Sequence, residues 1–354
     1  MTLLKQTVSR ITPQDETFRK QAKRRLDQLT MPHWALGRLM DLAMDLAGMT
    51  RSLNPPVARR VVVTMAADHG VAAEGVSQYP QEVTRQMVLN FLRGGAGINA
   101  MARVVRANVV VVDMGVAAEM GDIPVSESFF ARPVRRGTRN MVKGPAMSRE
   151  EALRCVETGI EIAQTLSASY DLFATGEMGI GNTTPSSAIV AVMTGSQVPQ
   201  VTGHGTGINE QRFFHKIEVI EKALAVNQPN SNDALDVLAK VGGFEIGGLA
   251  GLMLGVASRQ KPVLVDGFIS TAAALIAQGL APAVTDYLIA AHRSVEQGHQ
   301  AALARLGKKP LMDLDLRLGE GTGAALAMAL VEASVRILTE VATFEEAGVS
   351  EADT

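Results

Sequence analysis

The sequence predicts an α/β protein: a doubly wound, mainly parallel six-stranded sheet with a small helical subdomain built from both termini. Three observations support this prediction. From about residue 60 onward, short apolar runs alternate with longer segments of helical periodicity, which is typical of a parallel sheet covered by helices. The apolar runs are nearly continuous in Val, Leu, Ile and Ala, as in strands buried on both faces. Both ends of the chain carry helical periodicity without a strand pattern beside it.

Six apolar runs are expected to form the strands: residues 60–66, 108–114, 171–175, 262–266, 286–291 and 311–316. Helical periodicity covers residues 16–46 and 324–346 at the two ends. We therefore assign residues 1–50 and 326–354 to the helical subdomain, and residues 51–325 to a large α/β domain that carries the candidate catalytic residues. Between strands, Ser148 and Glu151 have the spacing of a capping box, so Cys155 is expected to be an ordinary residue of the helix that follows.

Composition excludes several classes of protein. The 354 residues include 47% hydrophobic and 20% charged residues, which is typical of a globular chain and not of a disordered one. The 34 Lys and Arg residues nearly balance the 36 Asp and Glu residues, and aromatics make up only 4%. A basic groove with stacking platforms for nucleic acid is therefore not expected.

Location and metal content can also be predicted. Cys155 is the single cysteine, which excludes an internal disulfide and any multi-cysteine metal site and favours a reducing compartment. No signal sequence and no uncharged apolar stretch of about 18 residues is evident. We expect a cytoplasmic protein with no membrane insertion.

Polar residues gather directly after the expected strands. In open parallel sheets, ligands bind outside the carboxyl ends of the strands. The segments at these positions are unusually polar: residues 68–70, 176–184, 266–267 with 270–271, 292–294 with 296 and 299, and 317–323. They are expected to converge on one crevice.

Two glycine-rich turns are candidate phosphate sites, since glycine lets a backbone approach a ligand and a helix N-terminus attracts anions. Residues 181–184 precede a helical segment, and residues 203–207 precede Lys216, which can add a point charge. The alternative is that these glycines serve only tight turns.

Three nucleotide-binding fingerprints mostly fail. Gly319-x-Gly321-x-x-Ala324 fits the dinucleotide pattern, but no second strand with an acidic end follows it. Residues 263–267 resemble the start of a diphosphate-ribose loop, but such loops use adjacent acids to help hold a metal-bound pyrophosphate, and position 267 is Gly. A Mg-pyrophosphate substrate is therefore disfavoured. No Gly-x-x-x-x-Gly-Lys-Ser/Thr loop is present, which disfavours ATP or GTP hydrolysis.

Glu177 and Glu320 are the candidate catalytic residues, each flanked by glycines in what is expected to be a post-strand turn. A carboxylate among apolar neighbours can have its pKa raised toward neutrality and act as a general base. The alternative is an ordinary exposed turn acid. His69, His292 and His299 lack metal-ligand spacing, so we predict no metal site.

With these motifs in place, the chain resembles the nicotinate-nucleotide:dimethylbenzimidazole phosphoribosyltransferases of the cobalamin nucleotide-loop pathway over nearly its whole length. The resemblance rests on eight segments together: residues 68–71, 74–84, 94–99, 137–138, 144–147, 176–184, 203–207 and 318–325. It implies transfer of ribose 5-phosphate from nicotinate mononucleotide to 5,6-dimethylbenzimidazole, giving alpha-ribazole 5'-phosphate and nicotinate, with no cofactor.

The resemblance also implies roles for individual residues. Glu320 would be the general base, and Glu177 would lie in the same site. Part of the benzimidazole pocket would come from Ser77, Gln78, Tyr79 and Gln86. The remaining substrate-binding residues would be Gly176, Gly179, Gly181, Asn182, Thr183, Gly203, Gly205, Thr206, Gly207, Lys216, Asp266, Arg317, Leu318 and Gly319. His204 departs from the family pattern and receives no role.

Members of this family are homodimers in which the partner's small domain helps to close each site, so a homodimer is implied here. Two other classes stay open. An NAD-dependent oxidoreductase would need a glycine triplet at the first strand, where the sequence has Ala67-Asp68-His69-Gly70. A non-catalytic nucleotide sensor is separated from an enzyme only by a turnover assay.

Overall fold

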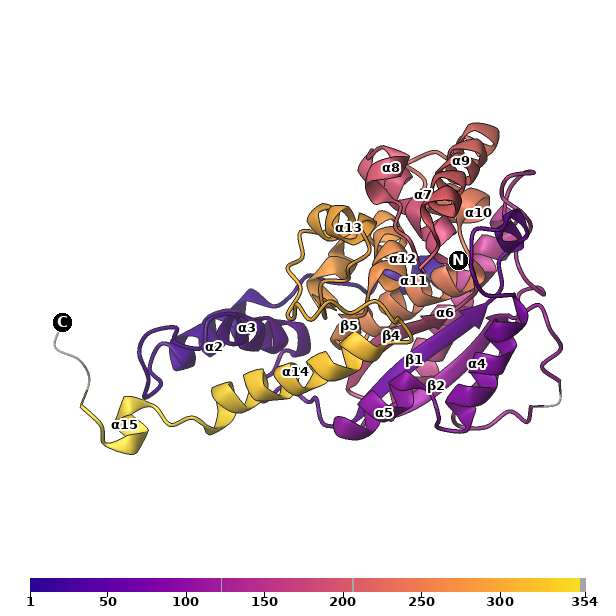
Figure 1. The fold of residues 1–354 in the computed structure, drawn as a ribbon. Helices are drawn as coiled ribbons and strands as arrows, with labels where there is room; N and C mark the ends of the chain where they lie inside the picture. The colour runs from indigo at the N-terminus through magenta and orange to yellow at the C-terminus, as the bar shows by residue number, and fades with distance from the viewer. Residues whose placement is uncertain (122, 206, 351–354) are drawn as a thin grey trace.

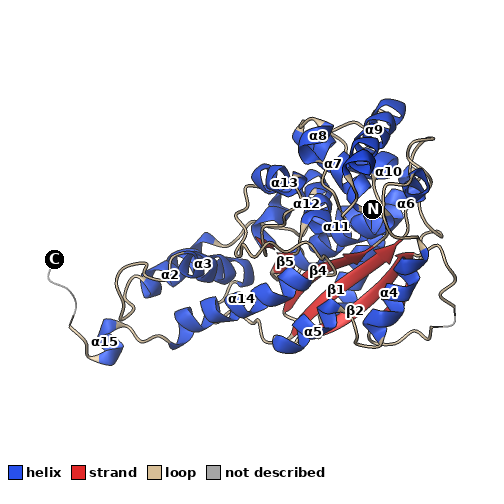
Figure 2. Ribbon diagram, in the orientation of Figure 1, coloured by secondary structure: helices blue, strands red, loops and turns tan. Residues whose placement is uncertain are grey.

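One six-stranded sheet forms the centre of the molecule. The structure is a computed structural model, and it describes residues 1–121, 123–205 and 207–350. The strand order of the sheet is β3-β2-β1-β4-β5-β6, and every neighbouring pair is parallel (Figure 2). The strands are β1 (Arg60–Ala67), β2 (Asn108–Gly115), β3 (Phe129–Ala131), β4 (Leu172–Met178), β5 (Val263–Val265) and β6 (Leu288–Ala290). The chain runs outward from β1 to β3 and then returns to β4 on the other side. The switch point therefore lies between the carboxyl ends of β1 and β4.

Helices cover both faces of the sheet (Figure 1). One face packs against α4 (Glu82–Leu92), α5 (Gly97–Val104) and α14 (Thr322–Glu340). The other packs against α11 (Phe244–Ala257) and α12 (Phe268–Leu280), with α6 (Arg149–Leu166) on the outer side of α11. Every residue of α11 is buried, as expected for a helix that is apolar all round. The doubly wound fold is thus confirmed.

Further helices lie above the carboxyl ends of β4 to β6. They are α7 (Thr183–Thr194), α8 (Val198–Val201), α9 (Glu210–Asn227), α10 (Ala234–Val241) and α13 (Gly298–Leu306). Of the 3-10 helices, η1 (Gly70–Glu74) follows β1, and η2 (Pro282–Tyr287) directly precedes β6 at its amino end. The predicted capping box at Ser148 begins α6, and Cys155 is a buried residue of that helix.

One of the six predicted strands is wrong. Residues 311–316 form an extended segment with a single bridge between Met312 and His292, not a sheet strand. The segment lies just past the carboxyl end of β6, where Leu311 N–H donates to the Ala290 carbonyl. The sixth strand is instead β3, three residues at the sheet edge, paired with β2. A run as short as Phe129–Ala131 carries too little pattern to be found from sequence.

The terminal helices project from the sheet as an arm, which contains α2 (Glu16–Leu26), α3 (Arg38–Thr50), the distal part of α14 and α15 (Phe344–Ala347) (Figure 1). The periodic segment 16–46 is two helices, separated by a loop in which Trp34 and Gly37 have positive φ. The arm has its own apolar cluster, drawn from both ends of the chain: Ala22, Leu26, Leu29, Met40, Ala43, Ala47, Ile337 and Leu338.

The division into residues 1–50 plus 326–354 and residues 51–325 stays a prediction. Two contacts bear on where a boundary would fall. Helix α1 (Leu3–Val8) packs against α6 of the large body, where Leu4 N–H donates to Glu157 Oε1 over 3.0 Å. Helix α14 runs without interruption across position 325.

Helix α14 is also long and apolar enough to cross a bilayer by length and composition alone. Of that stretch, 61% is buried inside the protein. The helix packs against α3, α5, β4 and β5. These contacts are those of a core helix in a globular fold.

Candidate active site

A cavity of about 440 Å³ lies at the carboxyl ends of β4, β5 and β6. It has the size and position of a small-molecule site in an open α/β sheet. Ten of the residues singled out from the sequence line it: Tyr79, Glu177, Gly179, Asn182, Thr183, Gly205, Arg317, Leu318, Gly319 and Glu320. Four of the five polar segments therefore converge on one crevice as predicted, whereas residues 68–70 do not line it.

Glu177 is the penultimate residue of β4, because that strand continues to Met178 and does not stop at residue 175. The expected position of Glu177 in a post-strand turn is thus wrong. Its carboxylate is buried and accepts a hydrogen bond from Asn182 Nδ2. Burial raises the pKa of Glu177 to about 8, and the negative charges of Asp266, Glu245 and Glu320 act in the same direction. Glu177 is therefore mostly protonated near pH 7.

Glu320 lies in the turn before α14 and is only 6% exposed. Its Oε2 accepts a hydrogen bond of 3.0 Å from Ile98 N–H at the start of α5, and its carbonyl accepts one of 3.1 Å from Thr64 Oγ1 of β1. Burial raises the pKa of Glu320 above the usual value for Glu, while the Ile98 amide favours the ionised form. Neither Glu320 nor Glu177 is an exposed turn acid.

Two glycines allow the turn that carries Glu320 to lie close against the strand that carries Glu177. A Cβ on Gly319 would lie 2.2 Å from Glu177 Oε1, and a Cβ on Gly176 would lie 2.2 Å from the Glu320 carbonyl oxygen. Gly319 also has φ of +82°, which favours glycine. Gly176 therefore supports the Glu320 turn from behind and does not line the cavity.

Asp266, at the end of β5, is buried beneath the same turn and does not line the cavity. Its two oxygens accept hydrogen bonds from Gly321 N–H (3.2 Å) and Ala324 N–H (2.9 Å), the first amides of α14. Burial raises the pKa of Asp266. The observed contacts make Asp266 an anchor for the N-terminus of α14.

Lys216 of α9 is fully buried next to the glycine-rich turn. Its Nζ donates to Thr183 Oγ1 over 2.8 Å and to the Gly203 carbonyl over 3.2 Å. Burial lowers the pKa of Lys216 to about 8, opposed by the charge of Glu296. Lys216 thus lies one layer behind Thr183 and Gly205, which face the cavity.

The remaining sequence-predicted residues lie outside the cavity lining. Gln78 Nε2 donates to the Gly207 carbonyl and so connects two loops at the rim. Exposed His204, which received no role, stacks on Phe213 with ring centroids 4.5 Å apart. Thr206 lies outside the described residues. The others are Ser77, Gln86, Gly181 and Gly203.

Eleven lining residues were not among the sequence-predicted site residues. Five of them follow strand ends and had been noted for their position, namely Gly267, Ser270, His292, Ser294 and Glu296. The other six, Val83, Met87, Met178, Ile180, Phe268 and Ile269, are apolar, and of these Met178 and Ile180 belong to the noted segment 176–184. Nothing in the sequence distinguishes these apolar residues from ordinary core residues, because both kinds lie on helices or strand ends that face the sheet.

The three histidines that were considered as metal ligands all have other neighbours, and His292 Nδ1 lies 3.7 Å from Asp266 Oδ1. His69 pairs with buried Glu245 over 2.7 Å. His299 accepts from Ser294 N–H through Nδ1, and burial lowers its pKa to about 3, so the ring is neutral. Among residues 1–121, 123–205 and 207–350, no group of three or more His, Cys, Asp or Glu side chains is arranged to hold a metal ion.

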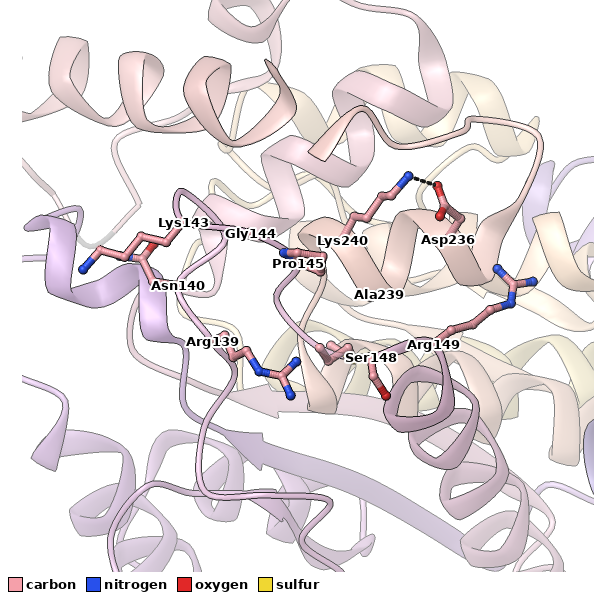
Figure 3. Close-up of a pocket in the computed structure, with 11 residues that line it drawn as sticks. Arg139, Asn140, Lys143, Gly144, Pro145, Ser148, Arg149, Asp236, Ala239 and Lys240 are labelled. Carbon is pink, nitrogen blue, oxygen red and sulfur yellow. Dashed lines mark ion pairs between the residues drawn. The ribbon is translucent and has the colours of Figure 1, made fainter. Parts of the chain in front are cut away.

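A second pocket, of about 660 Å³, is formed by residues 139–149 and α10 (Figure 3). It is lined by several cationic side chains, but most are already neutralised. Lys240 pairs with Asp236 over 2.9 Å, and Arg149 pairs with Asp233 over 2.8 Å. The pocket shares no lining residue with the 440 Å³ cavity.

Comparison with known proteins identifies the family. A family model described as phosphoribosyltransferase matches residues 11–349. The chain belongs to this phosphoribosyltransferase family. The resemblance noted from the motifs is thereby confirmed.

Similar proteins narrow the family further. A nicotinate-nucleotide–dimethylbenzimidazole phosphoribosyltransferase of Syntrophotalea carbinolica is 66% identical over 351 residues, with 99% of each chain covered. One of Geobacter sulfurreducens is 56% identical over the full length of both chains. A crystal structure of the enzyme so named from Thermus thermophilus superposes with a TM-score of 0.90 at 47% identity, covering 96% of this chain and 100% of that one. In this phosphoribosyltransferase, the carboxyl edge of the sheet is therefore the place to seek ribosyl transfer.

Proposed function

We propose that the protein transfers ribose 5-phosphate from nicotinate mononucleotide to 5,6-dimethylbenzimidazole, giving alpha-ribazole 5'-phosphate and nicotinate, in cobalamin biosynthesis. The observation that supports this best is the position of Glu320. Its carboxylate is held at the wall of the cavity by Ile98 N–H, with a raised pKa suited to accepting a proton. Family membership and the names of the similar proteins point to the same reaction.

The leaving group needs little help. The ring nitrogen of nicotinate mononucleotide is a pyridinium, so breaking its bond to C1' returns the electron pair to a neutral ring. One nitrogen of dimethylbenzimidazole attacks C1' from the opposite face, which gives the alpha configuration. The N–H proton of the other ring nitrogen passes to Glu320. Positioning and one base are thus sufficient.

The charges of the cavity suit this reaction. Besides protonated Glu177, two carboxylates line it, Glu296 and Glu320, against the single guanidinium of Arg317 among the described lining residues. As the glycosidic bond breaks, positive charge develops on the ribose ring. Ionised carboxylates near that ring lower the energy of this charge.

The ends of the cavity differ in character and suggest how the substrates lie. Lys216, Thr183 and the turn at Gly203 to Gly205 offer a charge-assisted site for the 5'-phosphate. Tyr79, with Val83 and Met87 of α4, offers an apolar wall for the benzimidazole. The remaining sequence-predicted substrate contacts stay predictions.

We further infer a cytoplasmic homodimer that uses no cofactor, no nucleic acid and no membrane insertion. The projecting arm supports the dimer, because helices extended from one body can lie against the open site of a second copy (Figure 1). The homodimer is a prediction about assembly, and sedimentation of the purified chain measures the oligomeric state.

Turnover tests the proposed function. The purified protein is incubated with nicotinate mononucleotide and dimethylbenzimidazole, and the products are separated by chromatography. We expect alpha-ribazole 5'-phosphate and nicotinate in equal amounts. Nucleotide binding without product would favour a nucleotide sensor, and reduction of NAD by a hydroxy-substrate would favour an oxidoreductase.

A further inference from the structure

Glu296 is a buried carboxylate that the mechanism above does not use as a base. It follows β6, lines the cavity and is 9% exposed. No hydrogen bond to either carboxylate oxygen is found in the described part of the chain, and Oε2 is fully buried without a partner. A buried carboxylate without donors is costly, since it loses its hydration without replacement.

The surrounding contacts hold Glu296 in a defined place. Its N–H donates to Ser294 Oγ over 3.3 Å, and its carbonyl accepts from His299 N–H over 3.0 Å. His299 is fixed in turn, because Nδ1 accepts from Ser294 N–H and Nε2 lies 2.9 Å from Thr271 Oγ1. The side chain itself packs against Gly203, where a Cβ would lie 2.0 Å from Glu296 Oε2. The carboxylate is therefore preorganised.

Lys216 does not neutralise this carboxylate directly. Its Nζ donates to the Gly203 carbonyl and to Thr183, and it makes no ion pair with Glu296 among the described residues. Gly203 thus contacts the Lys216 ammonium through its carbonyl oxygen and lies against the Glu296 carboxylate at its Cα. A ligand here meets a cation and an acceptor close together.

The chemistry of the two substrates limits what Glu296 can bind. Phosphate and the nicotinate carboxylate are anionic acceptors, which Glu296 repels. The pyridinium nitrogen carries no proton, and the benzimidazole N–H is the proton that Glu320 takes. The remaining donors are the 2'- and 3'-hydroxyls of the ribose. These are linked through C4' and C5' to the phosphate, for which Lys216 is adjacent.

We propose that Glu296 accepts hydrogen bonds from the ribose hydroxyls of the nucleotide and makes the site selective for ribonucleotides over deoxyribonucleotides. This inference rests on the proposed function for the identity of the nucleotide. It adds a specificity-determining residue to the base and the phosphate site.

A cycle of variant against substrate tests the proposal. We compare kcat/KM of the wild-type protein, Glu296→Ala and Glu296→Gln on nicotinate mononucleotide and on its 2'-deoxy and 3'-deoxy analogues. A hydrogen bond to a charged group corresponds to roughly a 10- to 100-fold change. Glu296→Ala should lose this factor on the ribonucleotide and much less on at least one deoxy analogue. Glu296→Gln, which keeps an acceptor oxygen, should lose less.

The ratio of the two losses decides the outcome, because the different intrinsic reactivity of deoxyribosides cancels in the cycle. Equal losses on all three nucleotides overturn the proposal. Lys216→Ala should reduce all three equally, since it acts on the phosphate, and Glu221→Ala on the exposed face of α9 is the matched control that changes none. Circular dichroism of each variant establishes folding.

Calorimetric binding separates this proposal from the proposed function. If the wild-type protein binds nicotinate mononucleotide but forms no product, the proposed function fails. The Glu296 proposal then stands or falls on binding alone: Glu296→Ala should weaken binding of the ribonucleotide roughly 10-fold or more relative to its deoxy analogues. Equal weakening overturns it.

Discussion

Glu320 combines a strained backbone with a buried carboxylate. Its φ is +61°, a left-handed conformation that a non-glycine side chain adopts at a cost of about 1 to 2 kcal/mol. The hydrogen bonds from Thr64 and Ile98, and the close approach of Gly176, hold the residue there. Such strain persists where the surrounding structure fixes it, and it directs the carboxylate toward the cavity.

Glu320→Gln should lower kcat by about 10²- to 10⁴-fold with little change in KM for either substrate, because it removes proton acceptance but keeps size and hydrogen bonding. Steady-state kinetics with both substrates measure this. Glu177→Gln is the matched variant in the same cavity, and a larger effect there would exchange the two roles. A Glu320→Gln variant that keeps more than about a tenth of wild-type kcat would make Glu320 a structural residue.

Glu177 should make folding stability depend on pH. Its pKa rises from 4.5 to about 8 on folding, so between these values the folded protein holds a proton that the unfolded chain has lost. The free energy of unfolding therefore falls as pH rises through this window, by up to about 1.4 kcal/mol per pH unit from this group. Urea unfolding at pH 5, 6, 7 and 8 should give a shallower decline for Glu177→Gln than for the wild-type protein. Parallel curves would mean that Glu177 is not buried as a neutral acid.

For individual residues, the sequence predicts membership of the site best where the position at the end of a strand alone determines the neighbours. Glu177 and Asn182 end or follow a parallel strand, and Glu320 follows the extended segment 311–316 beside β6, so all three meet at the same edge of the sheet. Asp266 follows a strand as well, but whether it faces the cavity or the first amides of α14 depends on side-chain direction, which the pattern does not determine. The same is true of Glu296, whose lack of partners appears only in three dimensions.

Among the elements, α6 and α11 pack most closely. A Cβ on Gly159 of α6 would lie 1.9 Å from the Gly248 carbonyl oxygen, and one on Gly251 of α11 would lie 1.9 Å from the Val156 carbonyl oxygen. Both obstacles are backbone atoms, which cannot rotate away. The two glycines therefore set the distance between the helices and, through α11, the layer above the sheet.

Gly159→Ala should destabilise the protein by about 1 to 3 kcal/mol, because overpacking outweighs the gain of up to about 1 kcal/mol in helix propensity. Chemical denaturation measures the change. Glu161→Ala, at an exposed position of the same helix, reports propensity without the clash. A stabilised Gly159→Ala variant would show that the helices can separate at little cost.

The elements that sequence predicted correctly are those with long apolar runs. Strand β1 is buried at all eight positions, and its run of Val residues favours a strand buried on both faces. Residues 311–316 alternate Leu with Asp, which suits an exposed strand equally well as the extended segment that the structure has. Only a neighbouring strand to pair with would distinguish an exposed strand from an extended segment, and such a neighbour is not adjacent in the sequence.

For the molecule as a whole, catalysis should persist in excess EDTA. The departing nicotinate becomes neutral at the ring nitrogen, so the proposed reaction calls for no Lewis acid. Chelation tests every possible site at once, including any formed between two copies. Turnover is measured after dialysis against EDTA, and a loss that Mg²⁺ restores would refute the prediction.

The length of α14 has a geometric consequence for the whole molecule. The helix begins at the Glu320 turn, where Asp266 binds its first amides, and at 1.5 Å per residue its 19 residues reach about 28 Å into the arm. Each residue also turns the helix by about 100°. One residue inserted after exposed Ala329 would leave the site chemically complete, yet rotate the distal apolar face of the arm away from α2 and α3. Seven inserted residues would restore the angle to within about 20° but shift the arm outward by about 10 Å. The number of residues in α14 therefore determines the direction in which the arm projects from the carboxyl edge of the sheet.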